Sequence, residues 1–313
     1  MQSRKLLQTD KNFISNGAEK LVFFGSFLFT SENNYCTIVK KRNGDLHMSD
    51  LYSSIGIYSV ESTVSELFGL PSPVEDGQKN ELILSLAQNK LGGEKIDRAV
   101  LYNPDAVALW LYQKYTEKFT KAALCSDLAV PMLSVMPSVT PVCFASMYTG
   151  VLPSVHGIQK YEKPVLRVNT LFDTLAKNGK KCAIVSTAGD SISKIFLERD
   201  MDYYIYDSID EVNKKALELI SEDKYDLITI YNGNYDSIMH KFGPESAEAL
   251  SQLEANVEFY DILVNKIKSE WQEHKTFYGF MPDHGCHKID GECGSHGLDM
   301  QEDMNIIHFY GIA

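Results

Sequence analysis

The chain has 313 residues, of which 44% are hydrophobic and 23% charged, a composition typical of a soluble globular protein of one or two domains. Its net charge of −12 argues against a nucleic-acid polymer or an anionic membrane as a partner held by broad electrostatics. The longest apolar run near the start, residues 21–29, is far shorter than a membrane span, and no convincing signal-peptide cleavage site accompanies it. Six scattered cysteines lack the dense spacing of a secreted disulfide scaffold: Cys36, Cys125, Cys143, Cys182, Cys286 and Cys293. We therefore expect a soluble, cytoplasmic protein that does not act at a membrane.

The first 95 residues carry little recognisable chemistry. Strands are predicted at residues 21–30 and 36–41, with a hairpin-turn signal at Asn43-Gly44. Amphipathic patterns at residues 61–70 and 80–90 predict two helices. We interpret residues 1–95 as an accessory segment that packs on the core, residues 96–313, as part of the same domain.

From Asp97 onward, short apolar strands alternate with helices. Strands are predicted at residues 98–102, 182–186, 227–231, 276–281 and 305–310. One helix is predicted after Asp105, ending at about Tyr115, and further helices at residues 169–179, 210–221 and 244–268. This alternation predicts an α/β fold with three layers, α/β/α, in which helices cover both faces of a mostly parallel central sheet.

Acids and histidines follow three of the predicted strands, where ligands of such sheets bind. Asp105 follows the first strand, and Asp236 and His240 follow the strand at 227–231, with a helical spacing that puts both on one face. Asp283 and His284 follow the strand at 276–281, and His296 lies in the loop beyond. A single acid there is more often a helix cap, and a single histidine is more often a buried polar group. Three acids and three histidines at the ends of three strands together predict a metal site. This mix of nitrogen and carboxylate ligands suits zinc or manganese.

A second interpretation is a structural zinc knuckle without enzymatic activity, formed by His284, Cys286, Cys293 and His296. It leaves Asp105, Asp236 and His240 unexplained, so we favour the larger site. For the remaining candidates His156, His287 and His308 we expect structural roles.

Residues 136–150 predict a helix, with Thr140 as its N-cap, Pro141 at its first position and Gly150 at its end. A helix N-terminus favours a phosphate, because its backbone N–H groups and dipole attract negative charge. A threonine hydroxyl beside that phosphate is a poor nucleophile unless a metal or a base lowers its pKa. Thr140 is therefore a candidate nucleophile, although a capping role alone is also open; Ser138 is the next candidate.

These segments resemble the alkaline phosphatase superfamily, in particular its type I phosphodiesterase/nucleotide pyrophosphatase branch. The resemblance spans residues 97–313 and rests on several separated motifs: Pro137-Ser-Val-Thr-Pro, Ala145-Ser-Met-Tyr-Thr-Gly-Val-Leu-Pro-Ser-Val-His-Gly157, Asp236-x3-His240, Asp283-His284-Gly285 and Ser295-His296-Gly297. It implies an alkaline-phosphatase-like fold, Thr140 as the nucleophile and two divalent metal ions, commonly zinc. By the same resemblance, Asp236, His240 and His296 hold one ion, and Asp105, Asp283, His284 and the Thr140 oxygen hold the other.

The resemblance implies a hydrolase of small-molecule phosphoesters, of the phosphodiesterase or nucleotide pyrophosphatase type. It also implies an amide that orients the phosphoryl oxygen, a role for which Cys143 is a poor donor and Asn103 or Asn234 are alternatives. The Cys/Ser-x-Pro-x-Arg motif of sulfatases is missing, so sulfate-ester cleavage is not expected. A phosphomutase with the same core is the main alternative activity.

Overall fold

The computed structural model describes residues 22–24, 27–29 and 52–313. The chain divides into two compact units, Met1–Asn43 and Gly44–Ala313. In the first unit, β1 (Val22–Phe24) and β2 (Phe27–Phe29) pair antiparallel, where the sequence pattern predicts one continuous strand. The predicted strand at residues 36–41 and the turn at Asn43-Gly44 lie outside the described residues.

The second unit is built on a seven-stranded sheet with the order β4–β11–β8–β3–β7–β5–β6. Its strands are β3 (Arg98–Pro104), β4 (Leu128–Leu133), β5 (Cys182–Thr187), β6 (Asp202–Tyr206), β7 (Leu227–Asn232), β8 (Thr276–Phe280) and β11 (Asn305–Ile312). The pairs among β8, β3, β7, β5 and β6 are parallel, whereas β11 runs antiparallel to both of its neighbours. A separate antiparallel ladder joins β9 (His287–Lys288) to β10 (Gly294–Ser295).

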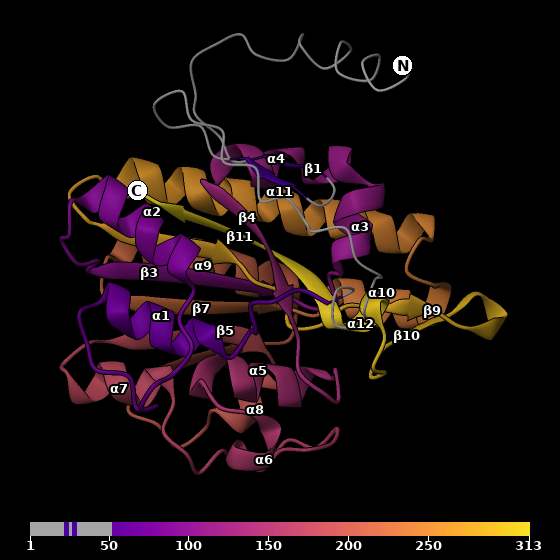
Figure 1. Cartoon of the computed structure of the whole chain (residues 1–313), viewed down its shortest axis with the longest axis horizontal. Coiled ribbons are helices and arrows are strands. Elements are labelled where there is room, and N and C mark those ends of the chain that lie inside the picture. The colour runs from indigo at the N-terminus through magenta and orange to yellow at the C-terminus, as the bar shows by residue number, and fades with distance from the viewer. Residues whose placement is uncertain (1–21, 25–26, 30–51) are drawn as a thin grey trace, which may run out of the picture. The chain divides into compact units, whose positions relative to one another are not determined.

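Helices cover both faces of the sheet, which confirms the predicted three-layer α/β/α fold (Figure 1). They are α1 (Ser59–Leu67), α2 (Glu81–Leu91), α3 (Leu109–Lys114), α4 (Thr120–Cys125), α5 (Thr140–Thr149), α6 (Pro153–His156), α7 (Leu171–Lys177), α8 (Ile192–Ile195), α9 (Ile209–Glu222), α10 (Asn234–Phe242), α11 (Ala247–Glu270) and α12 (Gln301–Met304). The described residues also form the 3-10 turns η2 (Thr116–Phe119) and η3 (Asp290–Glu292). On one face α11 packs with α4 and α9, and on the other α5 packs with α1 and α7.

The strands β4 and β6 are not predicted from the sequence pattern, because both lie at the edges of the sheet. The strand β4 contains Pro131, which lacks a backbone donor and is tolerated in an edge strand. The strand β6 is tyrosine-rich and half exposed, so it shows no apolar run. Central strands such as β7 are buried along their whole length and are predicted correctly.

Predicted helix boundaries differ from the observed ones at several places, including the starts of α7, α11 and α5. The cap of α7 is Thr170 rather than Asn169, because Thr170 and Asp173 form a capping box. The long helix begins at Ala247 rather than Pro244, with Ser246 as its cap. The helix α5 begins at Thr140 itself, after Val139 at the N-cap position, so the Thr140 hydroxyl does not cap it.

The register of the central strands brings the predicted site residues together. Tyr102 of β3 lies opposite Phe280 of β8, and Asn103 lies opposite Tyr231 of β7. The carboxyl ends of these three neighbouring strands therefore lie at one edge of the sheet. The chain continues from them into Asp105, into α10 with Asp236, and into Asp283.

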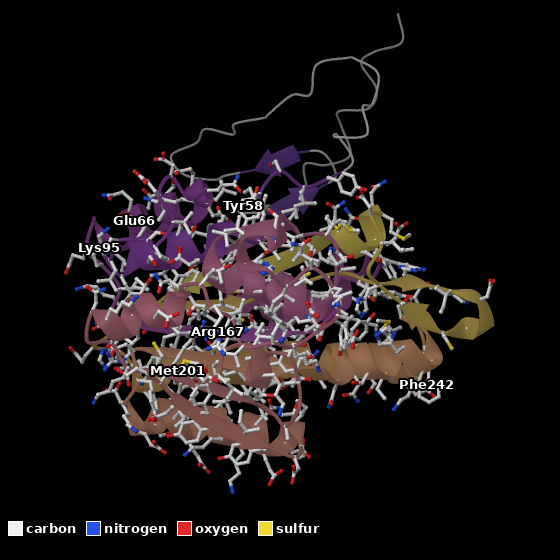
Figure 2. All side chains as sticks on the ribbon, turned by 90° about the horizontal axis from the view of Figure 1, so that it is seen from below. Tyr58, Glu66, Lys95, Arg167, Met201 and Phe242 are labelled. Carbon is white, nitrogen blue, oxygen red and sulfur yellow. The ribbon has the colours of Figure 1, made fainter. Side chains whose placement is uncertain are left out.

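The surface of the second unit is polar, with ion pairs such as Lys95–Glu66 at 2.8 Å, which Figure 2 shows at its periphery. Exposed apolar side chains such as Phe242, labelled in the same view, are scattered. Among the helices that the structure describes, none has the length and apolar character to cross a membrane.

Candidate metal centre

The first group of candidate ligands is fully buried and consists of Asp105, Asp283 and His284. The Nε2 atom of His284 lies 3.4 Å from Asp105 Oδ1 and 3.4 Å from Asp283 Oδ2. Gly285 follows them at a place where a Cβ atom would lie 2.0 Å from the Glu302 carbonyl oxygen, so a residue without a side chain is needed there. The end of β8 thus presents two adjacent ligand residues against a closely packed backbone.

The second group consists of Asp236, His240 and His296 and is more open to solvent. Asp236 lies in the first turn of α10 and His240 in its last, and Asp236 Oδ1 lies 3.3 Å from His240 Nε2. His296 follows β10, and its Nε2 atom lies 3.4 Å from the same oxygen and 3.1 Å from His240 Nε2. One carboxylate oxygen and two imidazole nitrogens therefore face one point.

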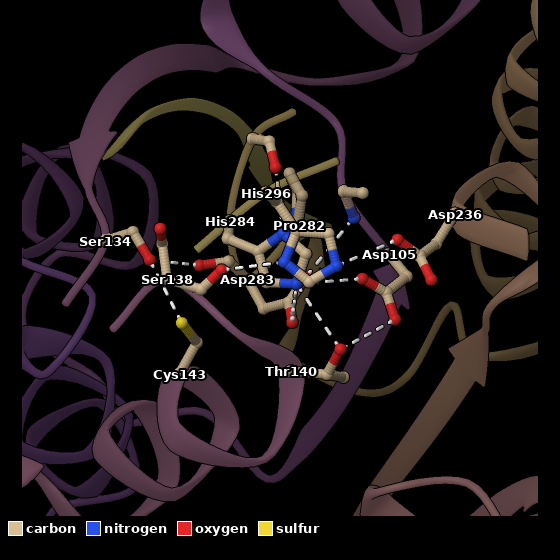
Figure 3. A network of polar contacts seen from close by, with 12 residues as sticks. Asp105, Ser134, Ser138, Thr140, Cys143, Asp236, Pro282, Asp283, His284 and His296 are labelled. Atoms are coloured by element: carbon tan, nitrogen blue, oxygen red, sulfur yellow. Dashed lines mark hydrogen bonds and ion pairs between the residues drawn. The ribbon is translucent and has the colours of Figure 1, made fainter. Parts of the chain in front are cut away.

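The two groups are adjacent and Thr140 lies beside the first. The rings of His284 and His296 stack with centroids 3.9 Å apart, which joins the two groups. The Thr140 hydroxyl lies 3.4 Å from Asp105 Oδ2 and 3.3 Å from His284 Nε2 (Figure 3). The structure therefore brings together all seven residues that the sequence singled out.

The histidine rings are oriented as metal ligands usually are. In each ring the Nδ1 atom lies within hydrogen-bond distance of a backbone carbonyl: Gly294 for His240, Gly285 for His284 and Ser138 for His296. Because a carbonyl only accepts, Nδ1 must carry the hydrogen, and the neutral ring then directs the lone pair of Nε2 into the site. The Nε2 lone pairs of all three histidines are thus oriented to bind a cation.

The carboxylates also fit a cation. One oxygen of each aspartate is buried and has no hydrogen-bond partner: Asp105 Oδ1, Asp236 Oδ1 and Asp283 Oδ2. Burial and the nearby charge of Asp236 raise the pKa of Asp105 to about 7, and burial together with Asp105 raises the pKa of Asp283 well above its usual range. Buried, crowded carboxylates of this kind are costly unless a positive charge compensates them. The donor set of carboxylates and imidazoles suits zinc or manganese.

The chain matches the type I phosphodiesterase / nucleotide pyrophosphatase family over residues 104–305, which is more than half of its length. The chain belongs to this family. Human ectonucleotide pyrophosphatase/phosphodiesterase 5 has a similar fold, with a TM-score of 0.52 and 16% identity over 62% of this chain and 58% of that chain. The murine counterpart, solved as an inactive threonine-to-alanine variant in complex with AMP, gives a TM-score of 0.52 and 14% identity over 63% and 59% of the two chains. The match thus spans less than two thirds of these relatives, and no curated protein matches the chain in sequence.

A cleft of about 610 Å³ opens beside the candidate site of this type I phosphodiesterase family member. Asp105, Thr140 and Asp236 line it, together with residues from the loops that follow β5, β6 and β7. Tyr161 and Lys163 add an aromatic ring and a cation, with the Lys163 Nζ atom 5.3 Å from the ring centroid of Tyr161.

Of the three candidates for the phosphate-orienting group, Asn234 alone lines this cleft. The amide of Asn103 is buried and bonded to Leu101, Ile230 and Tyr148. The Cys143 thiol is buried 3.2 Å from the Ser134 hydroxyl. Sequence reasoning missed Tyr231, Tyr161 and Lys163 as cleft residues, because no local pattern distinguishes them from other strand or loop residues.

The zinc-knuckle interpretation has no support, because neither Cys286 nor Cys293 belongs to a ligand group among the described residues. The Cys286 thiol is buried 3.6 Å from the Tyr235 hydroxyl, and His284 and His296 belong to different groups. His287 is bonded to Asp303, and His156 to Ser146, which agrees with structural roles.

His308 has a structural role that can be measured through pH. Its Nε2–H donates to the Pro282 carbonyl at 2.7 Å, so Nδ1 accepts from the Tyr310 hydroxyl at 2.6 Å. Burial lowers the pKa of His308 to about 3. Between that value and its ordinary pKa near 6.5, the unfolded chain binds a proton that the folded chain does not. This contribution to stability is complete above about pH 6.5 and is lost as the pH falls toward 3.

We expect the free energy of unfolding to fall less steeply with acidification in His308→Gln than in the natural chain. The difference in slope should approach about 1.4 kcal/mol per pH unit between pH 6 and 4. Urea titrations of the chelator-treated proteins at several pH values measure this slope. Equal slopes in both proteins would show that His308 is not the buried neutral group.

Proposed function

We propose that the chain hydrolyses phosphoesters of small molecules, as a phosphodiesterase or nucleotide pyrophosphatase with a threonine nucleophile and two divalent metal ions, zinc or manganese. The observation that carries this proposal is the placement of two three-residue ligand groups beside the Thr140 hydroxyl. Family membership supports the same activity.

Asp236, His240 and His296 would hold one ion, and Asp105, Asp283, His284 and the Thr140 oxygen the other. Bound there, the ions would lower the pKa of the Thr140 hydroxyl and neutralise charge on the phosphoryl oxygens. The unpartnered oxygens and the orientation of the imidazole rings support this assignment.

In the first step the Thr140 oxygen attacks phosphorus, and the bond from phosphorus to the departing alcohol breaks. Asp105 Oδ2, 3.4 Å from the Thr140 hydroxyl, is the nearest acceptor for the Thr140 proton that an ion would leave free. The product is a phospho-threonine, and the departing alcohol takes a proton. Water then hydrolyses this ester, which restores the Thr140 hydroxyl and releases the second product.

The cleft supports a small polar substrate, because its lining is dominated by hydroxyl, amide and charged groups. Asn234 would orient a phosphoryl oxygen through its amide. The murine neighbour was solved with AMP, so we propose a nucleotide ester as the first natural substrate to examine.

A phosphomutase remains the alternative, since the same groups could return the phosphoryl group to a sugar phosphate instead of to water. The two activities differ in one observable, the release of inorganic phosphate or of a free phosphomonoester.

We also propose that the protein is cytoplasmic, which agrees with free thiols at the five cysteines that the structure describes. We further propose that residues 1–95 are an accessory segment of the same domain.

Removal of metal should abolish activity. We expect the chelated protein to lose hydrolysis of bis-p-nitrophenyl phosphate and p-nitrophenyl phosphate, and to regain it with zinc or manganese. Metal analysis should find two ions per chain in the active protein. The preferred ester distinguishes a phosphodiesterase from a phosphatase. Two bound ions without hydrolysis would favour the mutase, whereas one ion and no turnover would contradict the proposal.

A further inference from the structure

Tyr231 makes a contact with the candidate site that neither its sequence pattern nor its strand position explains. It is the penultimate residue of β7, it is buried, and it lines the cleft beside Asp105 and Thr140. Its hydroxyl donates a hydrogen bond to Asp105 Oδ2, the same oxygen that Thr140 contacts. The other oxygen of this carboxylate, Oδ1, has no hydrogen-bond partner and faces His284.

The two oxygens of the Asp105 carboxylate therefore have different environments. A carboxylate accepts hydrogen bonds at both oxygens, and either one can bind a cation when no donor occupies it. The tyrosine donor keeps Oδ2 occupied and leaves Oδ1 for the ligand group. Because tyrosine is a neutral donor, it stabilises the buried carboxylate without cancelling the charge that attracts an ion. Among the described residues no lysine or arginine forms an ion pair with Asp105, whose ion-pair neighbour is His284.

The position of the Tyr231 hydroxyl is set by packing on three sides. The ring packs edge-to-face against Phe144 at a centroid distance of 5.8 Å, and Phe144 lies one turn after Thr140 in α5. A Cβ atom at Gly233 would lie 2.7 Å from the hydroxyl oxygen, so glycine leaves the space that the hydroxyl occupies. The backbone that carries Tyr231 is joined to that of Asp105 by the bond from Asp105 N–H to the Asn232 carbonyl, 2.9 Å long.

We propose that Tyr231 is the positioning residue of the Asp105 ligand group: it holds Oδ2 of Asp105 so that Oδ1 binds the ion of that group. The inference rests on the proposed function, because it presumes that an ion binds there. It concerns the ion at Asp105, Asp283 and His284 and not the ion at Asp236, His240 and His296. Tyr231 acts on the ion through Asp105, so its loss weakens binding without removing a ligand.

The test is zinc titration by calorimetry on Tyr231→Phe, which keeps the ring and removes the hydroxyl. We make the change in two backgrounds, each with one ligand group intact: Asp236→Ala keeps the Asp105 group, and His284→Ala keeps the Asp236 group. We expect zinc affinity to fall about tenfold or more in the first background and to stay unchanged in the second. Tyr148→Phe is the matched control, because its buried hydroxyl on α5 bonds to Asn103 outside the cleft.

The thermal midpoint of each protein in chelator shows whether folding itself is disturbed. Equal midpoints for Tyr231→Phe and Tyr148→Phe, with weaker zinc binding in Tyr231→Phe alone, support the positioning role. Gly233→Ala provides a second variant, since it displaces the hydroxyl and should weaken zinc binding in the same background. Unchanged affinity in Tyr231→Phe, or an equal loss in both backgrounds, overturns the inference while leaving the proposed function intact. A natural chain that binds no zinc overturns both.

Discussion

Replacement of Thr140 by alanine should lower the turnover of a phosphodiester by about three orders of magnitude or more. The hydroxyl lies beside Asp105 and His284 at the start of α5, and no other hydroxyl contacts both side chains among the described residues. Its loss removes the attacking atom but leaves the two carboxylate-and-imidazole groups in place. We therefore expect Thr140→Ala to retain nearly all of its bound metal. Steady-state hydrolysis of bis-p-nitrophenyl phosphate, with metal analysis of the same samples, measures both quantities.

Ser138→Ala is the matched control for this experiment. Ser138 lies two residues before Thr140, but its hydroxyl donates to the Leu298 carbonyl at 3.2 Å. We expect this variant to keep most of its turnover. Natural rates in Thr140→Ala would refute the assignment, and a large loss in Ser138→Ala instead would identify Ser138 as the nucleophile.

Replacement of Asp236 by alanine should remove one of the two ions and lower kcat/KM roughly a hundredfold or more. Asp236 Oδ1 is the oxygen that faces both His240 and His296, so without it only two ligands of that group remain. Metal analysis should find one ion per chain in the variant and two in the natural protein.

The thermal midpoint separates loss of the ion from damage to the fold. An ion that binds only the folded chain raises its stability, so the natural protein should gain more than Asp236→Ala on addition of zinc. In chelator the two proteins should unfold at similar temperatures. Asp210→Ala, which changes an acid in the same cleft outside both groups, is the control and should keep two ions. An Asp236→Ala protein with two ions and full activity would contradict the ligand assignment.

The fold of the core could be predicted where burial leaves a clear pattern in the sequence. The strand β7 is buried along its length and appears as a continuous apolar run, and α10 confirms the helical spacing predicted for Asp236 and His240. The edge strand β4, with Pro131, and the tyrosine-rich β6 could not be predicted, because edge strands are only partly buried and carry weaker periodicity. The sequence pattern predicts Thr140 as the N-cap of α5, because a threonine before a proline is a frequent cap, whereas the structure has Val139 at that position.

The sequence by itself determined the candidate ligands, because each follows a strand that is apolar enough to predict, and parallel strands end at one edge of a sheet. It also carried the family, through motifs that are local in the chain. Only the tertiary structure decided which ligands share a group and that Asn234 rather than Asn103 lines the cleft. It also showed that one buried oxygen of each of Asp105, Asp236 and Asp283 has no hydrogen-bond partner. It alone placed Tyr231 against Asp105, two residues 126 positions apart. Such contacts depend on strand register and side-chain packing between distant segments, and no local pattern in the sequence encodes them.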